Sequence, residues 1–195
     1  RENWAGTLVV IAQPAEERGA GARLMLADGL FDKFPTPDYN LSLHTLATLP
    51  AGKVGYVPGW MMANVDSVDI RLKGIGGHGA YPHAAKDPVV LAAAIIMDLQ
   101  TLVSRELHPT EPGVVTVGSV HAGTKHNIIP DNATLQLTVR SYSDEARATL
   151  LDGIRRIAIK QAEALGFDGA LTPEVEVRDE YTTALWNDPA LVERG

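Results

Sequence analysis

Between residues 65 and 181 the sequence switches several times between the two-residue period of a β-strand and the longer period of an α-helix. Apolar and charged residues alternate from Val68 to Lys73, which predicts a strand with one buried face and one wet face. Asp87-Pro88 then opens a helix that we expect to reach about Leu107. Its predicted apolar stripe consists of Val89, Ile95, Ile96, Leu99, Leu102 and Val103.

The same pattern then recurs in the second half of this region. Residues 114–120 and 135–139 predict two more strands, and Ser143 caps a second helix that ends at Gly166. The buried face of that helix is predicted to carry Leu150, Ile154, Ile157, Ala158 and Leu165. Val175 and Val177 mark a last strand. The order β-α-β-β-α-β is that of a ferredoxin-like sandwich, with both helices on one face of an antiparallel sheet.

The two flanking pieces have a different character. Residues 7–12 are an unbroken apolar run, which predicts a parallel strand buried on both faces, and a short helix follows from about Gly21 to Ala27. Residues 41–43 and 55–57 are further strand candidates. We therefore expect an α/β fold with a partial catalytic domain at 1–64, a ferredoxin-like domain at 65–181, and a return to the first domain at 182–195. In this last piece, Asn187-Asp188-Pro189 is typical of a helix start.

Composition excludes several classes of function. The net charge is −7 and no run of Lys and Arg occurs, so we expect no nucleic-acid partner. We see no apolar stretch close to the roughly 20 residues of a membrane helix, so we expect no membrane partner. The chain has no cysteine, which excludes disulfides and thiolate metal ligands within it.

Two acids and a histidine follow predicted strands of the first piece. Glu16 and Glu17 end the motif Gln13-Pro14-Ala15-Glu16-Glu17 just beyond the apolar run, at a strand end where α/β sheets bind ligands. Adjacent carboxylates on extended backbone point to opposite sides, so one can hold a metal while the other faces a water molecule. His44 also ends a short apolar run and could be a metal ligand. The alternative is structural: two acids favoured by a helix dipole and a loop histidine.

Further candidates lie in the ferredoxin-like region. Glycines on both sides of His78 leave its imidazole uncovered, although a flexible turn has the same composition. Asn127 and His121 lie near the loop that joins the two strands expected at the centre of the sheet. Arg140 falls on the polar face of its strand, where a guanidinium can hold a carboxylate with two parallel hydrogen bonds. An ordinary hairpin loop and a solvated arginine are the alternative.

The order of these motifs resembles one family over essentially the whole chain. The motifs are Gln13-Pro14-Ala15-Glu16-Glu17, Leu43-His44, Gly76-Gly77-His78-Gly79-Ala80-Tyr81-Pro82-His83, His121-Ala122-Gly123, Asn127-Ile128-Ile129-Pro130-Asp131 and Thr138-Val139-Arg140. Together they resemble the N-acyl-amino-acid amidohydrolases, the hippurate hydrolase and indole-acetyl-amino-acid hydrolase branch of the aminoacylase/carboxypeptidase-G metallopeptidases. The resemblance implies a zinc-peptidase-like α/β catalytic domain with an inserted ferredoxin-like lid that forms dimers.

The resemblance also implies roles for individual residues. Glu16 resembles the general base, and Glu17 and His44 resemble metal ligands. His78 resembles the lid histidine that stabilises the oxyanion in the neighbouring subunit's active site. The substrate's free carboxylate would be received by Asn127 and Arg140. The parent enzyme would use two divalent metal ions, zinc or manganese, act on small-molecule N-acyl amino acids, form a homodimer through the lid, and be cytoplasmic.

The sequence also departs from the family pattern. The upstream His-x-Cys-Gly-His-Asp segment and the downstream metal-binding histidine of the family do not occur in it. We therefore expect an internal segment that is inactive alone and has no tight two-ion site, because metal affinity needs a closed ligand set. The alternatives are a non-catalytic lid-type dimerisation or binding module and a related dimetal dipeptidase or deacylase. The pattern identifies neither the acyl group nor the metal.

Overall fold

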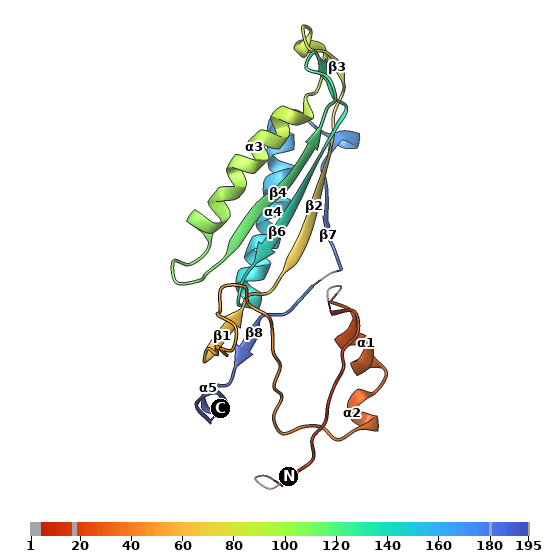
Figure 1. The fold of residues 1–195 in the computed structure, drawn as a ribbon. Helices are drawn as coiled ribbons and strands as arrows, with labels where there is room; N and C mark the ends of the chain where they lie inside the picture. The colour runs from red at the N-terminus through yellow and green to blue at the C-terminus, as the bar shows by residue number, and fades with distance from the viewer. Residues whose placement is uncertain (1–4, 17–18, 180, 195) are drawn as a thin grey trace. The chain divides into compact units, whose positions relative to one another are not determined.

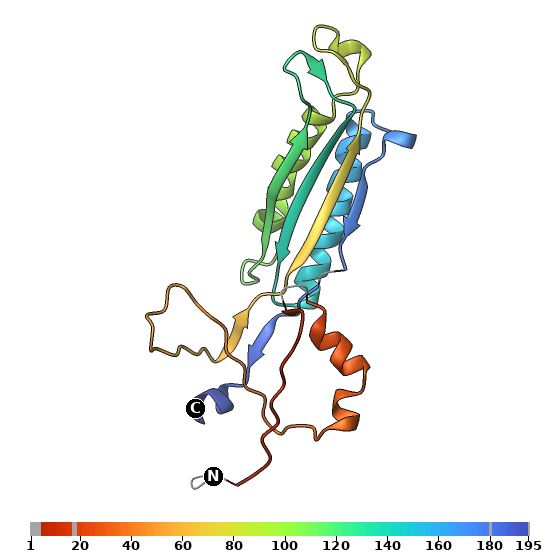
Figure 2. The ribbon, with the colours of Figure 1, turned by 45° about the vertical axis from the view of Figure 1, so that its right-hand side comes forward.

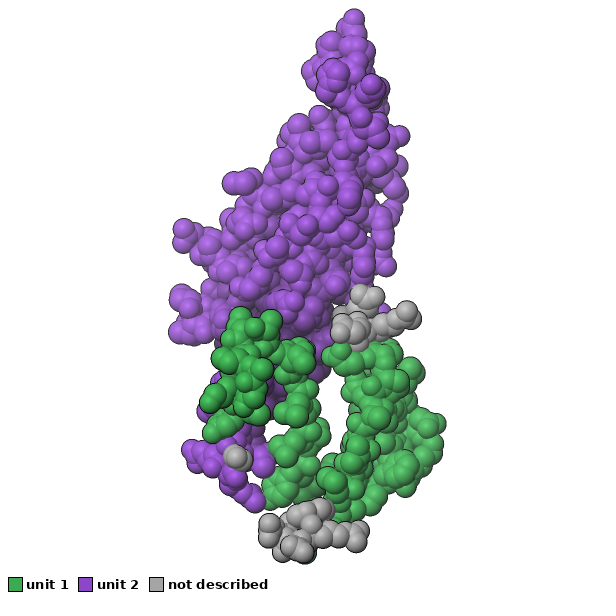
Figure 3. All heavy atoms as spheres, in the orientation of Figure 1, with its two compact units in different colours: residues 1–56 green, residues 57–195 purple. Residues whose placement is uncertain are grey.

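The computed structural model describes residues 5–16, 19–179 and 181–194. They fall into two compact units that divide between Tyr56 and Val57 (Figure 3). The first unit contains two short helices, α1 (Gly21–Ala27) and α2 (Leu30–Lys33). Gly29 between them has a φ of 81°, a left-handed conformation that glycine adopts without strain. The predicted helix at 21–27 is thus confirmed.

The strand predicted at residues 7–12 does not form. In this segment Leu8 and Val10 are 73% and 82% exposed, and no strand is assigned to the described residues before Gly59. The shorter candidates at 41–43 and 55–57 are wrong for the same reason. A parallel strand needs neighbouring strands to satisfy its backbone and helices to cover its faces, and the described part of this unit supplies no strand for pairing.

The second unit contains a four-stranded antiparallel sheet covered by two long helices. Its strands are β2 (Asp66–Lys73), β4 (Val114–Ala122), β6 (Asn132–Arg140) and β7 (Glu174–Val177), and its helices are α3 (Pro88–Thr101) and α4 (Asp144–Ala164). The strand order is β4-β6-β2-β7, and both helices lie on the same face of the sheet (Figures 1 and 2). The predicted ferredoxin-like order is confirmed. However, β4 is an edge strand and not a central one.

The core lies between this sheet and the two helices. Val68, Ile70 and Leu72 from β2 alternate with polar residues and are buried, as are the inward residues of β6. The helices contribute Leu91, Ile95, Leu99, Leu102, Leu150, Ile154, Ile157 and Ala158. The predicted apolar stripe of the first helix was wrong at its two ends. Val89 and Val103 are 44% and 38% exposed and do not belong to the buried face.

The helix ends follow from local sequence. The Asp87 carboxylate accepts from Val89 N at 2.8 Å at the start of α3, and Ser143 Oγ accepts from Ala146 N at 3.1 Å at the start of α4. After Thr101 the first helix continues as one π-helical segment, η3 (Leu102–Glu106). Leu165 lies beyond the last residue of α4 and is 40% exposed, so its predicted place on the buried face was wrong; Phe167 fills that end of the core instead.

Short elements extend the sandwich at its two ends. At one end, the tip, β3 (Gly77–His78) pairs with β5 (Ile128–Ile129), beside η2 (Pro82–Ala84). At the other end, the root, β1 (Gly59–Met62) pairs with β8 (Leu185–Asn187), and α5 (Pro189–Arg194) follows. A short η4 (Gly169–Leu171) precedes β7. The predicted helix start is confirmed, since the Asp188 carboxylate accepts from Leu191 N at 2.8 Å.

Buried polar contacts tie the chain together at the root. Asn64, which is 2% exposed, donates from Nδ2 to Ser141 Oγ at 2.7 Å and accepts from Ser141 N at 2.7 Å. Asp66 is fully buried and accepts two hydrogen bonds from Arg147 at 2.9 and 2.7 Å. The Arg147 guanidinium lies 4.1 Å from the ring centre of Tyr181. The strand that enters the sandwich is therefore fixed to α4 and to the segment that leaves.

Among the described residues, one helical stretch, Pro88–Glu106, is long and apolar enough by length and composition to cross a membrane. The expectation that no stretch approaches that length was wrong. One side of this stretch belongs to the core described above, which requires Leu91, Ile95 and Leu99 to be apolar. Its outer side has no such requirement.

Candidate functional site

Glu16 lies in a tight turn that leads into α1. Gly19 N donates to the Glu16 carbonyl oxygen at 2.8 Å, and the Glu16 side chain is exposed. Ala15 has a φ of 52°, a left-handed conformation that costs a residue with a side chain roughly 1–2 kcal/mol. A Cβ at Gly21 would lie 1.6 Å from the carbonyl oxygen of Pro14, so only glycine lets the helix start so close to the motif. The turn thus presents Glu16 outward at the expense of local strain.

His44 lies in the same unit on an exposed loop. Its Nδ1 lies 2.6 Å from the carbonyl oxygen of Thr45. A carbonyl oxygen can only accept, so Nδ1 carries the proton and donates. The lone pair of the neutral ring is then on Nε2. Metal-binding histidines are held in this way, with the second ring nitrogen donating to a carbonyl or carboxylate.

The predicted metal ligands are only partly described. Glu17 lies outside the described residues. Within the described ranges, no group of three or more His, Asp or Glu side chains is placed to hold a metal ion. Carboxylate and imidazole groups are the donor types that zinc, manganese and cobalt all accept. The donor chemistry of Glu17 and His44 therefore fits a divalent ion, but the described residues do not form a closed ligand set.

The tip of the sandwich brings His78 and Asn127 together. His78 is paired with Ile128 across β3 and β5, and Gly79 N donates to the Asn127 carbonyl oxygen at 2.8 Å. Ala80 N donates to His78 Nδ1 at 3.1 Å, so the proton of the neutral imidazole is on Nε2. His78 therefore presents a hydrogen-bond donor to the outside, as an oxyanion-stabilising histidine would need.

Arg140 lies at the opposite end of the sandwich. It is the last residue of the nine-residue strand β6, which runs from the tip to the root, and it is exposed. At about 3.3 Å per residue, the strand alone separates the two ends by roughly 26 Å. Within one chain, Asn127 and Arg140 therefore cannot hold the same carboxylate.

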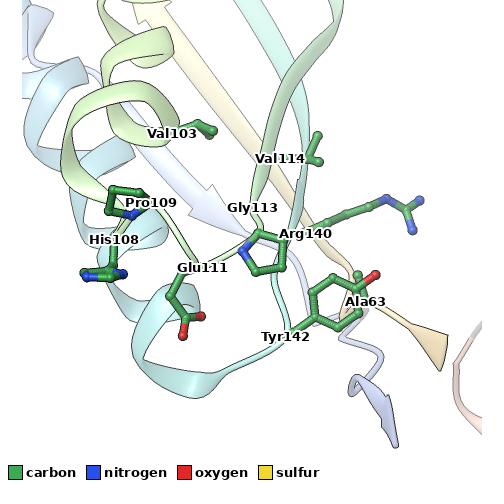
Figure 4. Close-up of a pocket in the computed structure, with 10 residues that line it drawn as sticks. Ala63, Val103, His108, Pro109, Glu111, Gly113, Val114, Arg140 and Tyr142 are labelled. Atoms are coloured by element: carbon green, nitrogen blue, oxygen red, sulfur yellow. The ribbon is translucent and has the colours of Figure 1, made fainter. Parts of the chain in front are cut away.

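An open pocket of about 460 Å³ adjoins Arg140 at the root. Its lining includes Ala63, Val103, His108, Glu111, Val114 and Tyr142. Figure 4 shows the Arg140 guanidinium directed away from His108 and Glu111. His108, Glu111 and Tyr142 are not among the candidate residues predicted from the sequence. Pro109 and Pro112 mark the loop that carries Glu111 and directly follows His108, whereas Tyr142 lies after the end of β6.

Comparison with known proteins identifies the family. Residues 63–165 match the family model of the peptidase dimerisation domain of the M20 peptidases. The chain belongs to the M20 peptidase family. The match begins at the root, just before β2, and ends with α4, so it covers three of the four sheet strands and both long helices of the sandwich.

Curated relatives of this M20 chain include two kinds of enzyme. It is 38% identical over 184 residues to an N-acetyldiaminopimelate deacetylase of Leuconostoc citreum, which covers 94% of the chain and 46% of that relative. It is 40% identical over 163 residues to a hippurate hydrolase of Campylobacter jejuni, covering 84% of the chain and 42% of that protein. The chain thus spans about half the length of the curated relatives it matches.

Solved structures give the same result for the fold of the M20 chain. A protein from methicillin-resistant Staphylococcus aureus, 36% identical, matches with a TM-score of 0.79 over 93% of this chain and 47% of that chain. The Bacillus subtilis YXEP protein, described as a dinuclear metal binding peptidase of the M20 family, is 32% identical and matches with a TM-score of 0.63 over 93% of this chain and 43% of its own. The predicted α/β fold with a ferredoxin-like lid is confirmed.

Proposed function

We propose that the chain is part of a metal-dependent amidohydrolase that hydrolyses the amide bond of N-acyl or N-aroyl amino acids. The observation that carries this proposal is the identity of 38–40% to an N-acetyldiaminopimelate deacetylase and a hippurate hydrolase. Both names describe the removal of an acyl group from the amino group of an amino acid. The substrate of one relative loses an acetyl group and the substrate of the other loses an aroyl group. The amidohydrolase class therefore has more support than either the acetyl-specific or the aroyl-specific activity.

In this proposal the first unit supplies the reacting groups. Glu17 and His44 would serve as ligands for two divalent ions, zinc or manganese, and such ions, when bound, would polarise the amide carbonyl and acidify the attacking water. Glu16 takes the proton of that water and passes it to the leaving amine. The exposure of the Glu16 side chain and the Nδ1 contact of His44 support these roles, since the carboxylate is open to a water molecule and the His44 contact leaves the lone pair of Nε2 for a metal.

The lid supplies the binding groups. His78 stabilises the oxyanion by donating from Nε2, and Asn127 and Arg140 receive the substrate's carboxylate. The family description of the matched region supports a homodimer through the lid. We place the lid at residues 65–181 and parts of the catalytic domain at 1–64 and 182–195. Acyl amino acids are small soluble metabolites, so we also propose a cytoplasmic location, with neither nucleic acid nor a membrane as partner.

The test is a variant of the parent enzyme. Glu16→Gln keeps the size of the side chain but removes the base, so kcat for N-acetyl and N-benzoyl amino acids should fall by roughly 10²–10⁴-fold with little change in thermal stability. Glu163→Gln, an exposed acid on α4, is the matched control and should keep full turnover. Full activity of Glu16→Gln would exclude this role, and a parent that hydrolyses no acyl amino acid would leave the lid as a non-catalytic dimerisation module.

A further inference from the structure

The side chain of His78 is exposed, although the role proposed for it requires a fixed direction. His78 lies in the two-residue strand β3 at the tip of the sandwich (Figure 1). Exposed side chains ordinarily change rotamer within picoseconds to nanoseconds. A donor that stabilises an oxyanion has to be held in place before the charge develops, because a loose donor must reorganise during the reaction. Other groups of the tip therefore have to hold this imidazole.

The backbone beneath His78 is fixed by pairing on both sides. β3 is paired with β5, and Gly79 N donates to the carbonyl oxygen of Asn127 at 2.8 Å. Ile75 and Lys86 exchange two backbone hydrogen bonds of 2.9 Å, which close the loop at its base. What these bonds leave free are the side-chain torsions of His78.

A tight turn brings the ring of Tyr81 back to the ring of His78. Tyr81 N donates to the carbonyl oxygen of His78 at 2.8 Å, which closes a β-turn across Gly79 and Ala80. The centres of the two rings lie 5.7 Å apart and their planes are inclined by 63°, an edge-to-face contact that aromatic rings favour. Together with the bond from Ala80 N to Nδ1, two contacts thus act on the imidazole itself.

Tyr81 is held from its other side as well. The centre of the His83 ring lies 6.2 Å from the centre of the Tyr81 ring, with the planes inclined by 71°. Pro82 follows Tyr81 with a fixed φ and begins η2, and Ala84 N donates to the carbonyl oxygen of Tyr81 at 3.1 Å. Tyr81 is 60% exposed and lies outside the hydrophobic core described above. Its ring contacts therefore belong to the tip alone, and their loss should leave the fold intact.

We propose that Tyr81 is a positioning residue for His78: its ring, supported by His83, holds the imidazole so that Nε2 donates in one direction. The proposal rests on the oxyanion role proposed above for His78 and adds the side chain that fixes the donor. The bond from Ala80 N alone lets the imidazole swing about the Nδ1 contact. A second contact, with the ring of Tyr81, removes that freedom.

The competing role for Tyr81 is a direct contact with the substrate. A phenol hydroxyl can donate a hydrogen bond to a developing oxyanion. The two roles need different parts of the side chain, since positioning uses the ring and a direct contact uses the hydroxyl. Tyr81→Phe keeps the ring and removes the hydroxyl, whereas Tyr81→Ala removes both. Comparison of these two variants separates the roles.

The first test is kinetic and uses the parent enzyme with N-acetyl and N-benzoyl amino acids. Tyr81→Ala should lower kcat by roughly 10–100-fold, because a displacement of about 1 Å in the donor can cost about 100-fold. KM should change little, since the imidazole acts on the transition state. Tyr81→Phe, the matched control, should keep nearly full turnover, and His83→Ala should lose less than Tyr81→Ala. Thermal unfolding of each variant establishes that it is folded.

A double-mutant cycle tests whether Tyr81 acts through the imidazole. In a His78→Ala background the group that Tyr81 positions is absent. Tyr81→Ala should then lower the remaining kcat no further, although it lowers that of the wild-type parent. The same fold loss in both backgrounds would mean that Tyr81 acts independently of His78, and would overturn the positioning role.

The second measurement needs no activity and uses the chain itself. Relaxation of the imidazole Cδ2–H group of His78, followed by NMR, should give an order parameter close to that of rigid backbone, about 0.85. In Tyr81→Ala the order parameter should fall to below about 0.6, the range of flexible groups, and in Tyr81→Phe it should stay high.

The outcomes separate the positioning role from the proposed reaction. An imidazole that is equally rigid in the wild type and in Tyr81→Ala would overturn the positioning role whatever the activity. Equal losses of kcat in Tyr81→Phe and Tyr81→Ala would overturn it in favour of a direct contact by the hydroxyl. A parent that hydrolyses no acyl amino acid, with an imidazole that loosens in Tyr81→Ala, would overturn the proposed function but support the contact between the two rings.

Discussion

Asp66 is the most completely buried acid in the described structure, and one side chain, Arg147, compensates for the burial of its carboxylate. Arg147 donates two hydrogen bonds to it, and these bonds raise the pKa of Arg147, against the opposing effect of burial. A buried carboxylate that loses its partner keeps the full cost of desolvation. The pair therefore fixes the root of the lid more through the penalty for breaking it than through its net attraction.

We predict that Arg147→Met lowers the free energy of unfolding by about 3 kcal/mol, measured by urea denaturation. Arg156→Met is the matched control. The Arg156–Glu106 pair has similar distances, but its side chains are 53% and 34% exposed, so its loss should cost about 1 kcal/mol or less. Equal losses in the two variants would mean that burial of Asp66 is not the source of the effect.

Glu174 is the acid whose titration the sheet alters most clearly. Its hydrogen bond with Lys73 lowers its pKa from the ordinary value, and Arg71 adds a smaller effect. Because the folded pKa lies below the unfolded one, the contribution of Glu174 to stability is complete above its ordinary pKa and is lost as the pH falls through the folded value.

Carboxyl chemical shifts followed by NMR should give this order directly. Lys73→Met should raise the pKa of Glu174 towards its ordinary value, and Arg71→Met should raise it less, since Lys73 is the larger cause. A larger response to Arg71→Met would reverse the assignment.

At the scale of elements, Gly153 decides how closely the end of the first helix approaches α4. A Cβ at this position would lie 2.3 Å from Cδ2 of Leu102, which is fully buried in η3. Glycine in the middle of a helix normally costs about 1 kcal/mol relative to alanine. Here the contact with Leu102 requires it.

Gly153→Ala should therefore destabilise the chain by about 1–2 kcal/mol in spite of its better helix propensity, as measured by chemical denaturation. In a Leu102→Ala background the crowding is removed, and the same substitution should become stabilising by up to about 1 kcal/mol. If Gly153→Ala stabilises both backgrounds alike, the side chain of Leu102 does not pack against residue 153 as closely as the structure shows.

The elements predicted correctly are those whose pattern is local and repeated. α3, α4, β2 and β6 each carry a cap or an alternation that specifies them without knowledge of the partner. The strand expected at 7–12 failed because an apolar run becomes a buried strand only where other strands pair with it. The β1–β8 pair was missed because it joins two short segments more than a hundred residues apart, with an irregular register between Trp60 and Met62.

The site could be predicted only as far as its motifs extend. A Cβ at Gly79 would lie 3.2 Å from the carbonyl oxygen of Asn127, so this glycine lets the two segments of the tip lie close together. Motif order could not reveal that Asn127 and Arg140 lie at opposite ends of the sandwich, because that depends on the direction of β6. The roles of Glu16, Glu17, His44, His78, Asn127 and Arg140 remain predictions.

For the whole molecule, the distance between Asn127 and Arg140 has a genetic consequence. If one copy contributes the tip and the other the root to a shared site, two inactive variants with substitutions at opposite ends can complement each other in a mixed dimer. Co-expressing the parent enzyme as Asn127→Ala and Arg140→Ala should restore about a quarter of wild-type turnover, since half of random dimers are mixed and each holds one intact site. Asn127→Ala with His78→Ala, both at the tip, should restore none. Whether a cell has the activity would then depend on which two alleles it carries together, and not on either allele alone.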